Sequence, residues 1–271
     1  MNFAEFITEQ QNTHMTHIED KVLYGGVNGT RQAILGLRSL RDTLGGAHDG
    51  NISVKWDGAP AVFCGTDPRD GRFFVAKKGI FNKNPKVYKT PAEVDADTSG
   101  DLSTKLKLAL KHFAELGIKG VIQGDLLFTK SDLKRSKIKG KQYVTFHPNT
   151  IVYAIPSNTE MAKELTSAKI GVVWHTTYTG NTFESMKASY GVNVSQLKKN
   201  KNVWQQDAML RDMSRFTMSK KDTEEVNGYL SQAGKLFNQI SGTTLRQLEA
   251  NQDLAQLIET FGNTYVRKGM V

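Results

Sequence analysis

The sequence predicts an α+β fold in three parts: a leader over residues 1–19, a body of strands and helices over residues 20–205, and a helical C-terminal segment over residues 206–271. Two observations predict it. Short runs rich in β-branched and aromatic residues, bounded by Gly, Asp and Pro, recur through the body and indicate strands. After about residue 205 these runs fade, and apolar residues recur with helical spacing.

In the first half of the body, the sequence pattern predicts a helix followed by two strands. Apolar residues spaced for one helical face lie between Asn28 and the pair Gly45-Gly46, which are the expected start and stop of the helix. Residues 51–56 and 60–64 follow as strands that are expected to pair around the turn Asp57-Gly58.

A second helix is predicted by the apolar stripe between Leu102 and Leu116, with Gly117 as its stop. The remaining elements are inferred from the same two periodicities. The other expected strands lie at 73–76, 120–128, 143–146, 150–155 and 170–176, and the expected C-terminal helices at Ala208–Phe216, Lys221–Ile240 and Thr244–Phe261.

The composition indicates a globular protein with an excess of positive charge. The chain has 271 residues, 38% hydrophobic and 23% charged, with a net charge of +9. Such an excess favours polyanionic partners, because each neutralised phosphate releases counterions. A basic protein without such a partner remains the alternative.

Cysteine usage and hydropathy narrow the working environment. Cys64 is the only cysteine, which excludes an intramolecular disulfide and a cysteine metal cluster and favours a reducing cytoplasm. No apolar stretch approaches the length of a membrane span, so no membrane partner is expected. The first twenty residues hold four acids and no Lys or Arg, which argues against a secretory signal.

The most informative motif is Lys55-Trp56-Asp57-Gly58, at a turn between two expected strands. An uncharged lysine amine can attack the α-phosphate of a nucleoside triphosphate and become covalently attached to it. A glycine at the turn lets the backbone approach a nucleotide closely. The alternative is an exposed lysine at a strand end beside an ordinary Asp-Gly hairpin.

From about residue 51 to residue 175 the chain resembles the phage-type members of the ATP-dependent RNA and DNA ligase and mRNA-capping superfamily of covalent nucleotidyltransferases. The resemblance is carried by an ordered set of motifs. These are Lys55-Trp56-Asp57-Gly58, Val75-Ala76-Lys77-Lys78-Gly79, Val121-Ile122-Gln123-Gly124-Asp125-Leu126-Leu127, Thr150-Ile151-Val152-Tyr153-Ala154 and Lys169-Ile170-Gly171-Val172-Val173.

The resemblance implies antiparallel sheets flanked by helices and a nucleotidyltransferase domain over residues 20–205. It also implies roles for individual residues, which we state as expectations. Lys55 is the nucleophile, Asp57 orients it, Gly58 gives the close approach, Lys77 and Lys78 contact phosphates, Asp125 binds ribose or a metal ion, Tyr153 stacks on adenine, and Lys199 and Lys201 form the fifth, Lys-x-Lys motif. The alternatives are a solvated charge pair for Lys77 and Lys78, an ordinary acid at a strand end for Asp125, a core aromatic for Tyr153 and a solvated loop for Lys199 and Lys201.

The implied activity is that of an ATP-dependent polynucleotide ligase with a lysyl-AMP intermediate on Lys55 and Mg²⁺ or Mn²⁺ as cofactor. The expected partner is nucleic acid, either RNA or a nicked duplex. RNA is preferred over DNA because the C-terminal segment is helical and no oligonucleotide-binding barrel is visible. GTP in place of ATP, and a protein or small molecule as acceptor, stay open.

Two departures from the family pattern favour an alternative function. Pro60 stands where the family often has arginine or asparagine, and Ile170 stands where the fourth motif has a carboxylate. Glu160 and Glu164 are substitutes only by proximity in sequence. A catalytically degenerate ligase fold that binds nucleic acid, or is packaged in a virion, is the competing interpretation. His175 is expected to be a core or loop residue.

The first nine residues carry a second resemblance. Phe3-Ala4-Glu5-Phe6-Ile7-Thr8-Glu9 is similar to the capsid-targeting leaders of internal proteins in large contractile-tailed phages. The resemblance implies docking on the prohead scaffold and cleavage after Glu9 by the prohead protease, with the protein packaged in the capsid and delivered to the host cytoplasm. A short N-terminal helix packed on the body is the alternative.

Overall fold

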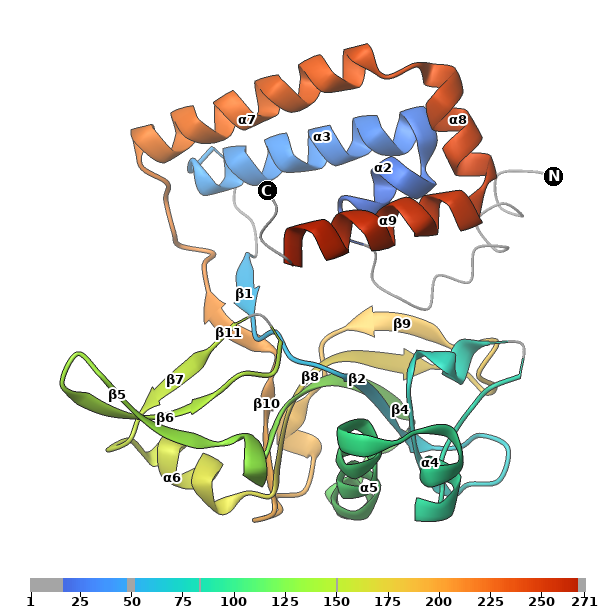
Figure 1. The fold of residues 1–271 in the computed structure, drawn as a ribbon, viewed down its shortest axis with the longest axis vertical. Coiled ribbons are helices and arrows are strands. Elements are labelled where there is room, and N and C mark those ends of the chain that lie inside the picture. The colour runs from blue at the N-terminus through green and yellow to red at the C-terminus, as the bar shows by residue number, and fades with distance from the viewer. Residues whose placement is uncertain (1–16, 48–51, 83, 150, 268–271) are drawn as a thin grey trace. The chain divides into compact units, whose positions relative to one another are not determined.

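The computed structural model describes residues 17–47, 52–82, 84–149 and 151–267, and they form a mixed α+β protein of antiparallel sheets and helices (Figure 1). The α+β class is thereby confirmed. Contacts divide the chain into two compact units, which we call the sheet unit (Lys55–Leu210) and the helical unit (Met15–Val54 with Arg211–Val271). The leader motif at residues 3–9 lies outside the described residues.

The sheet unit is built on a main sheet with the strand order β10-β8-β4-β2-β3, and β9 pairs with β8. Its ladders are antiparallel except for β10 and β8, which run parallel. The strands are β2 (Ala61–Thr66), β3 (Phe73–Ala76), β4 (Val121–Thr129), β8 (Ile170–Thr179), β9 (Lys187–Tyr190) and β10 (Val203–Asp207). The strands predicted at 60–64, 73–76, 120–128 and 170–176 are confirmed within a few residues as β2, β3, β4 and β8, whereas β9 and β10 were not predicted.

Helix α5 (Gly100–Phe113) covers one face of the main sheet, next to α4 (Pro91–Asp97) (Figure 1). Its apolar stripe is buried against strand residues of that face, including Val172 and Trp174. Gly117 has the left-handed conformation (φ 69°) after the short 3-10 turn that follows the helix. The predicted stripe and its glycine stop are both confirmed.

A second, three-stranded antiparallel sheet has the order β5-β6-β7, and we call it the small sheet. Its strands are β5 (Lys134–Ile138), β6 (Lys141–Phe146) and β7 (Tyr153–Pro156). Phe146 and Tyr153 on its inner face pack with Phe128 of β4 and with Leu165 of helix α6 (Glu160–Ser167). One face of the small sheet is therefore core.

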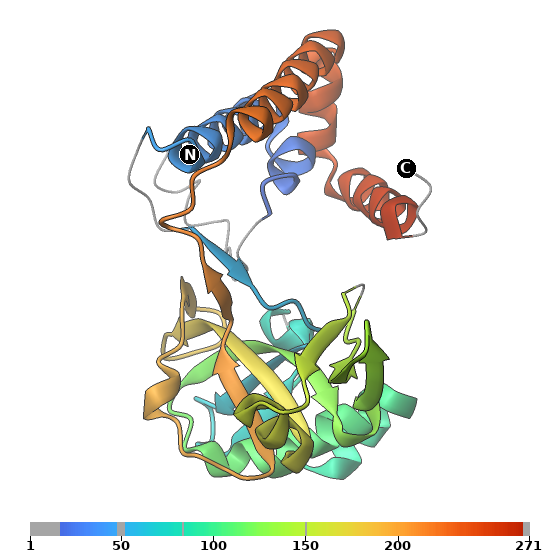
Figure 2. The ribbon, with the colours of Figure 1, turned by 90° about the vertical axis from the view of Figure 1, so that its left-hand side faces the viewer.

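The helical unit contains α2 (Asp20–Tyr24), α3 (Gly26–Leu44), α7 (Lys220–Gln239), α8 (Gly242–Ala250) and α9 (Gln252–Arg267). Helix α3 packs against α7 and α8, and α2 against α9 (Figures 1 and 2). Tyr24 donates a 2.6 Å hydrogen bond to Glu259 across the second of these contacts. None of the described helices is long and apolar enough to cross a bilayer.

The predicted pairing of residues 51–56 with 60–64 is wrong. Strand β1 (Ser53–Lys55) pairs with β11 (Met209–Asp212), while β2 pairs with β3 and β4. The cause is the backbone after Asp57, which continues along β4 instead of turning back. The Ala59 amide donates to Leu126 at 2.9 Å, and the Leu126 amide donates to Pro60 at 3.0 Å.

The predicted helix over Ala208–Phe216 is also wrong, because residues 203–207 and 209–212 are strands. Strand β10 is held by its ladder with β8, and all four residues of β11 are exposed, so neither shows an alternating pattern. The predicted helix over Thr244–Phe261 is two helices, α8 and α9. Asn251 separates them and accepts a 3.1 Å hydrogen bond from the Leu254 amide.

The structure groups the chain differently from the predicted boundaries at residues 19 and 205. The described part of Met15–Val54 belongs to the helical unit, because α3 buries its side against α7 and α8 rather than against a sheet. Short 3-10 helices in the described residues lie at Lys78–Phe81, Ala114–Leu116, Lys130–Asp132 and Val194–Gln196.

Candidate active site

Lys55 ends β1, and its amine lies beside a carboxylate of the main sheet. Its Nζ donates a 2.9 Å hydrogen bond to Oδ2 of Asp125, and 46% of the lysine side chain is exposed. The next residue anchors this strand end, because Trp56 is buried and its amide donates to the Ala208 carbonyl at 2.7 Å. An accessible amine is thus held by a fixed backbone.

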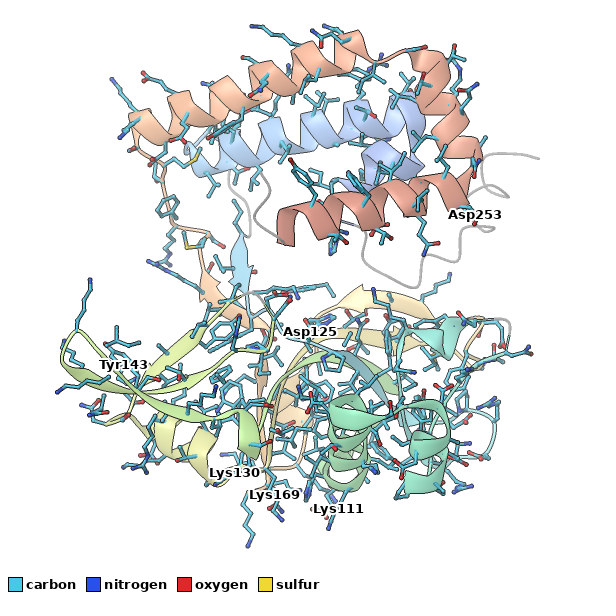
Figure 3. The ribbon with its side chains drawn as sticks, viewed as in Figure 1. Lys111, Asp125, Lys130, Tyr143, Lys169 and Asp253 are labelled. Carbon is cyan, nitrogen blue, oxygen red and sulfur yellow. The ribbon has the colours of Figure 1, made fainter. Side chains whose placement is uncertain are left out.

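Asp125 lies in the middle of β4, between Ala61 of β2 and Val173 of β8. Strand residues alternate between faces, and its neighbour Leu126 packs into the core under α5. Asp125 therefore points to the opposite face of the main sheet (Figure 3 labels it). Its side chain is only 10% exposed.

His175 is the second basic group next to Asp125. Its Nε2 is 3.5 Å from Oδ1 of Asp125, and its Nδ1 shares a 2.7 Å hydrogen bond with the Thr176 hydroxyl. The sequence pattern predicted a core or loop residue here. What the sequence lacked is the register: side chains alternate along a strand, so His175 shares a face with Val173, and Val173 is the ladder partner of Asp125.

Two neighbours determine the charge state of Asp125. Burial by itself raises the pKa of its carboxyl, but the hydrogen bond from His175 and the positive charge of Lys55 outweigh burial. The pKa of Asp125 therefore lies below its ordinary value. The carboxylate stays ionised at neutral pH, and it can bind a cation or accept a hydrogen bond from a sugar hydroxyl.

Asp57 is held by the small sheet rather than by Lys55. Its amide donates to the Tyr153 hydroxyl at 2.7 Å, that hydroxyl donates to the Asp57 carbonyl at 3.1 Å, and Asn149 Nδ2 donates to its carboxylate at 2.9 Å. Burial raises the pKa of Tyr153, which the bond from the Asp57 backbone partly offsets. Asp57 thus positions the loop that follows Lys55.

Tyr153 itself is a core residue. Its ring lies 4.8 Å from that of Trp56 and stacks on Phe146 at 5.2 Å, measured between centroids. Only 8% of Tyr153 is exposed. It supports the site through Asp57, and the expected adenine contact would require this packing to open.

Gly58 is required by close backbone approach. A Cβ at this position would lie 2.6 Å from the Leu126 carbonyl oxygen and 3.0 Å from Cβ of Asp125. Real Cβ atoms do not come that close to backbone oxygens, so a larger residue would push the loop away from β4. The glycine of the motif therefore sets the distance between Lys55 and Asp125.

Replacing Tyr153 with phenylalanine is expected to lower the free energy of unfolding by about 1 kcal/mol, because the partly buried Asp57 amide loses its partner. Urea denaturation followed by tryptophan fluorescence measures it. Tyr190→Phe, on the exposed strand β9, is the matched control and is expected to stay within about 0.5 kcal/mol of wild type. Equal stability of both variants would show that the hydroxyl does not hold the loop.

Lys77 and Lys78 are not brought to Lys55 by any described contact. Lys77 Nζ donates to Asp97 at 2.9 Å, and Lys86 binds the other oxygen of that carboxylate at 2.8 Å. The hydrogen bond to Asp97 raises the pKa of Lys77. Lys78 is exposed at the start of a 3-10 helix. A phosphate role for Lys77 would first require it to leave Asp97.

Lys199 and Lys201 line a separate hollow of about 310 Å³ together with Glu164 and Trp204, and neither Lys55 nor Asp125 borders it. The ladder explains the separation. The carbonyl of Asn202, next to Lys201, accepts a hydrogen bond from the amide of Ile170, the first residue of β8, whereas Asp125 pairs further along that strand. The Lys-x-Lys spacing therefore does not converge on the nucleophile.

At the position where the resemblance predicts the acid of the fourth motif, the chain has a buried apolar residue, Ile170. Ile170 is fully buried in the cluster under α5, on the face of the main sheet opposite Asp125. Of the two proposed substitutes, Glu160 pairs with Lys163 at 3.0 Å, and Glu164 lines the hollow beside Lys201. Within the described residues, His175 is the additional ionisable group that the structure places next to Asp125.

The described side chains limit how the expected Mg²⁺ could be bound. Among the described residues no group of three or more His, Cys, Asp or Glu could hold a metal ion. Mg²⁺ often binds through one or two carboxylates, several waters and the phosphates of a substrate. Asp125 fits that mode, in which the ion would arrive with the triphosphate and neutralise its charge.

The fold and the site define an α+β protein in which an exposed lysine, a buried carboxylate and a histidine meet at one face of a mainly antiparallel sheet. A sequence profile described as "Family of unknown function (DUF6267)" matches residues 12–271, so the chain belongs to this family. No curated protein and no solved structure matches the chain.

Proposed function

We propose that the protein is a covalent nucleotidyltransferase, and specifically an ATP-dependent polynucleotide ligase that acts through a lysyl-AMP intermediate on Lys55. The observation that carries the proposal is the 2.9 Å contact between Lys55 Nζ and Asp125 Oδ2, because these two residues come from the sequence segments that resemble the first and third ligase motifs. The two residues are 70 positions apart in sequence, so local chain geometry does not account for their contact.

The first step is a substitution at phosphorus. The Lys55 nitrogen forms a bond to the α-phosphorus of ATP, the bond from that phosphorus to the bridging oxygen breaks, and pyrophosphate leaves with that electron pair. The amine must lose its proton before it attacks, and because 46% of the Lys55 side chain is exposed, that proton can pass to solvent. His175 Nε2 lies 3.5 Å from the other oxygen of the carboxylate.

The second substrate follows from the overall charge. In this proposal AMP passes from Lys55 to a terminal 5′-phosphate, and a 3′-hydroxyl then displaces AMP to seal the strand. A net charge of +9 favours a polyanion as acceptor. RNA stays preferred over DNA, since the described C-terminal part of the chain is helical.

One observation favours the competing function, a degenerate ligase fold that binds nucleic acid without catalysis. Ile170 is core at the place of the fourth-motif acid, so one metal-binding carboxylate is missing there. A protein of this kind would keep the fold and the charge and lose the covalent step. The presence of the adduct separates the two functions.

The test is intact-mass analysis of the full chain after incubation with ATP and Mg²⁺, followed by peptide mapping. We expect one AMP adduct per chain, located on Lys55 and labile to acid as a phosphorus–nitrogen bond is. GTP and Mn²⁺ are tried in parallel to define the nucleotide and the ion. A protein that stays unmodified under all these conditions would refute catalysis and favour the degenerate fold.

A further inference from the structure

The outer face of the small sheet presents an aromatic ring between lysines. Residues directly opposite each other on antiparallel strands share a face, so the register places Ser136, Tyr143 and Pro156 in one row across the three strands. Lys134 and Lys141 lie on the same face, one row to either side of Tyr143. We call these residues the platform.

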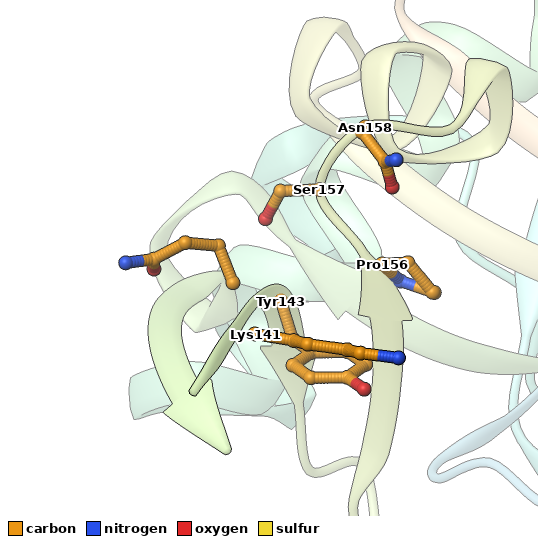
Figure 4. A pocket seen from close by; sticks show the side chains of 6 residues that line it. Lys141, Tyr143, Pro156, Ser157 and Asn158 are labelled. Atoms are coloured by element: carbon orange, nitrogen blue, oxygen red, sulfur yellow. The ribbon is translucent and has the colours of Figure 1, made fainter. Parts of the chain in front are cut away.

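Tyr143 borders an open hollow on this face. The hollow has a volume of about 620 Å³, and Lys141, Pro156, Ser157 and Asn158 line it with Tyr143 (Figure 4). Tyr143 is partly exposed, unlike Tyr153 on the inner face. A planar group can therefore reach the ring, and the amide and hydroxyl groups around it can meet polar edges.

The stretch of chain that forms the small sheet carries charged residues of one sign. From Leu133 to Thr159 the sequence contains no Asp or Glu, while it contains five Lys or Arg. Those cations are exposed, and none of them forms an ion pair with any described residue. The acids that bound this stretch are engaged: Asp132 caps the Thr129 turn, and Glu160 pairs with Lys163.

We propose that the platform binds single-stranded nucleic acid, with a base stacked on Tyr143 and the flanking phosphates held by Lys134 and Lys141. Strand spacing puts each lysine row about 7 Å from the tyrosine row. A stacked base beside cations is the usual way in which proteins hold single strands, because every base has a flat face and every nucleotide carries a phosphate. Lys134 and Lys141 are the cations of this stretch that the register places on the platform face, and an apolar or neutral partner would leave both unmatched.

This proposal rests on the proposed ligase function, because it specifies that the polynucleotide substrate is bound as a single strand. The platform is separate from the contact between Lys55 and Asp125. Figure 3 shows Tyr143 and Asp125 at different places in the sheet unit. Binding therefore does not require the covalent step and can be measured without ATP.

The test is fluorescence anisotropy of a labelled oligouridine with the full chain over a range of salt concentrations. We expect Tyr143→Ala to raise Kd about tenfold, and Tyr143→Phe to stay near wild type because the ring remains. The double change Lys134→Gln with Lys141→Gln should make the slope of log K against log salt shallower by about 1.4.

Controls with the same chemistry lie elsewhere in the sheet unit. Tyr190→Ala removes an exposed tyrosine of β9, and Lys119→Gln with Lys187→Gln removes the same charge from two exposed lysines, one just before β4 and one in β9. Both are expected to bind as wild type. Unchanged binding by Tyr143→Ala would overturn the proposal, and so would equal losses in the control variants.

Two further results separate a nucleic-acid site from a lipid site and from the catalytic site. Phosphatidylserine vesicles that bind with the same dependence on Tyr143 would show that the platform is a lipid site and would overturn the assignment. The platform variants are expected to keep the Lys55 adduct. A wild type that forms no adduct but binds oligouridine through Tyr143 would refute catalysis and leave the platform standing.

Discussion

Replacing Lys55 with arginine is expected to abolish transfer of AMP to the protein while leaving the fold intact. Arginine keeps the positive charge that pairs with Asp125, so the contact at the strand end is preserved. Its guanidinium stays protonated and cannot act as a nucleophile. The rate of adduct formation should fall at least about 10⁴-fold, as when other enzymes lose their nucleophile.

Lys107→Arg is the matched control for this change. Lys107 is an ion-paired lysine of α5, 2.7 Å from Asp95, and it has no part in the candidate site. It is expected to form the adduct at the wild-type rate. An adduct of undiminished yield on Lys55→Arg would show that the nucleophile is another residue.

A substrate that already carries AMP on its 5′-phosphate distinguishes loss of the nucleophile from damage to the whole site. Such a substrate bypasses the step in which Lys55 is consumed, so Lys55→Arg should still seal it if the polynucleotide site is intact. Failure of both the adduct and the bypass would instead indicate that the substitution damages the site as a whole.

Replacing Gly65 with alanine is expected to give the largest loss of stability, more than about 3 kcal/mol. A Cβ at Gly65 would lie 1.9 Å from the carbonyl oxygen of Gly120 and 2.9 Å from Cα of Val121. Both obstacles are backbone, and Gly65 is in the ladder between β2 and β4. The strands could make room only by separating, which would also displace Asp125.

Gly71→Ala is the control that distinguishes the cost of a steric clash, expected at Gly65, from the cost of backbone strain. Gly71 has a positive φ of 73°, and no atom lies within 4 Å of the place that a Cβ would take, so its cost is strain alone, about 1 kcal/mol. Thermal unfolding should show a Tm for Gly65→Ala about 10 °C below wild type and a much smaller decrease for Gly71→Ala. Equal shifts would mean that the close approach at Gly120 is relieved without cost.

The elements that were predictable are those whose pattern is local. The stripe of α5 and its stop at Gly117 carry both periodicity and a left-handed glycine, and both are observed. Strand β11 was missed because all of its residues are exposed and its partner β1 lies far away in the sequence. A strand without a buried face has no period-two signal, so only tertiary pairing reveals it.

The same distinction holds within the site. Lys55 and Asp125 were both predicted by motif order, and the structure places them in contact. His175 could be found only from register, because its position depends on which residue of β4 lies opposite Val173. Lys199 and Lys201 illustrate the converse, since a matching spacing in sequence does not bring side chains to the nucleophile.

The helical unit is formed from two stretches of chain that flank the sheet unit in sequence, and this order has a consequence for synthesis. Helix α3 leaves the ribosome roughly 10 to 35 s before α7, against which it packs. During that interval α3 must wait without its partner, while the continuous segment Lys55–Leu210 can already close. A chain whose translation stops early would therefore carry the lysine site without the completed helices.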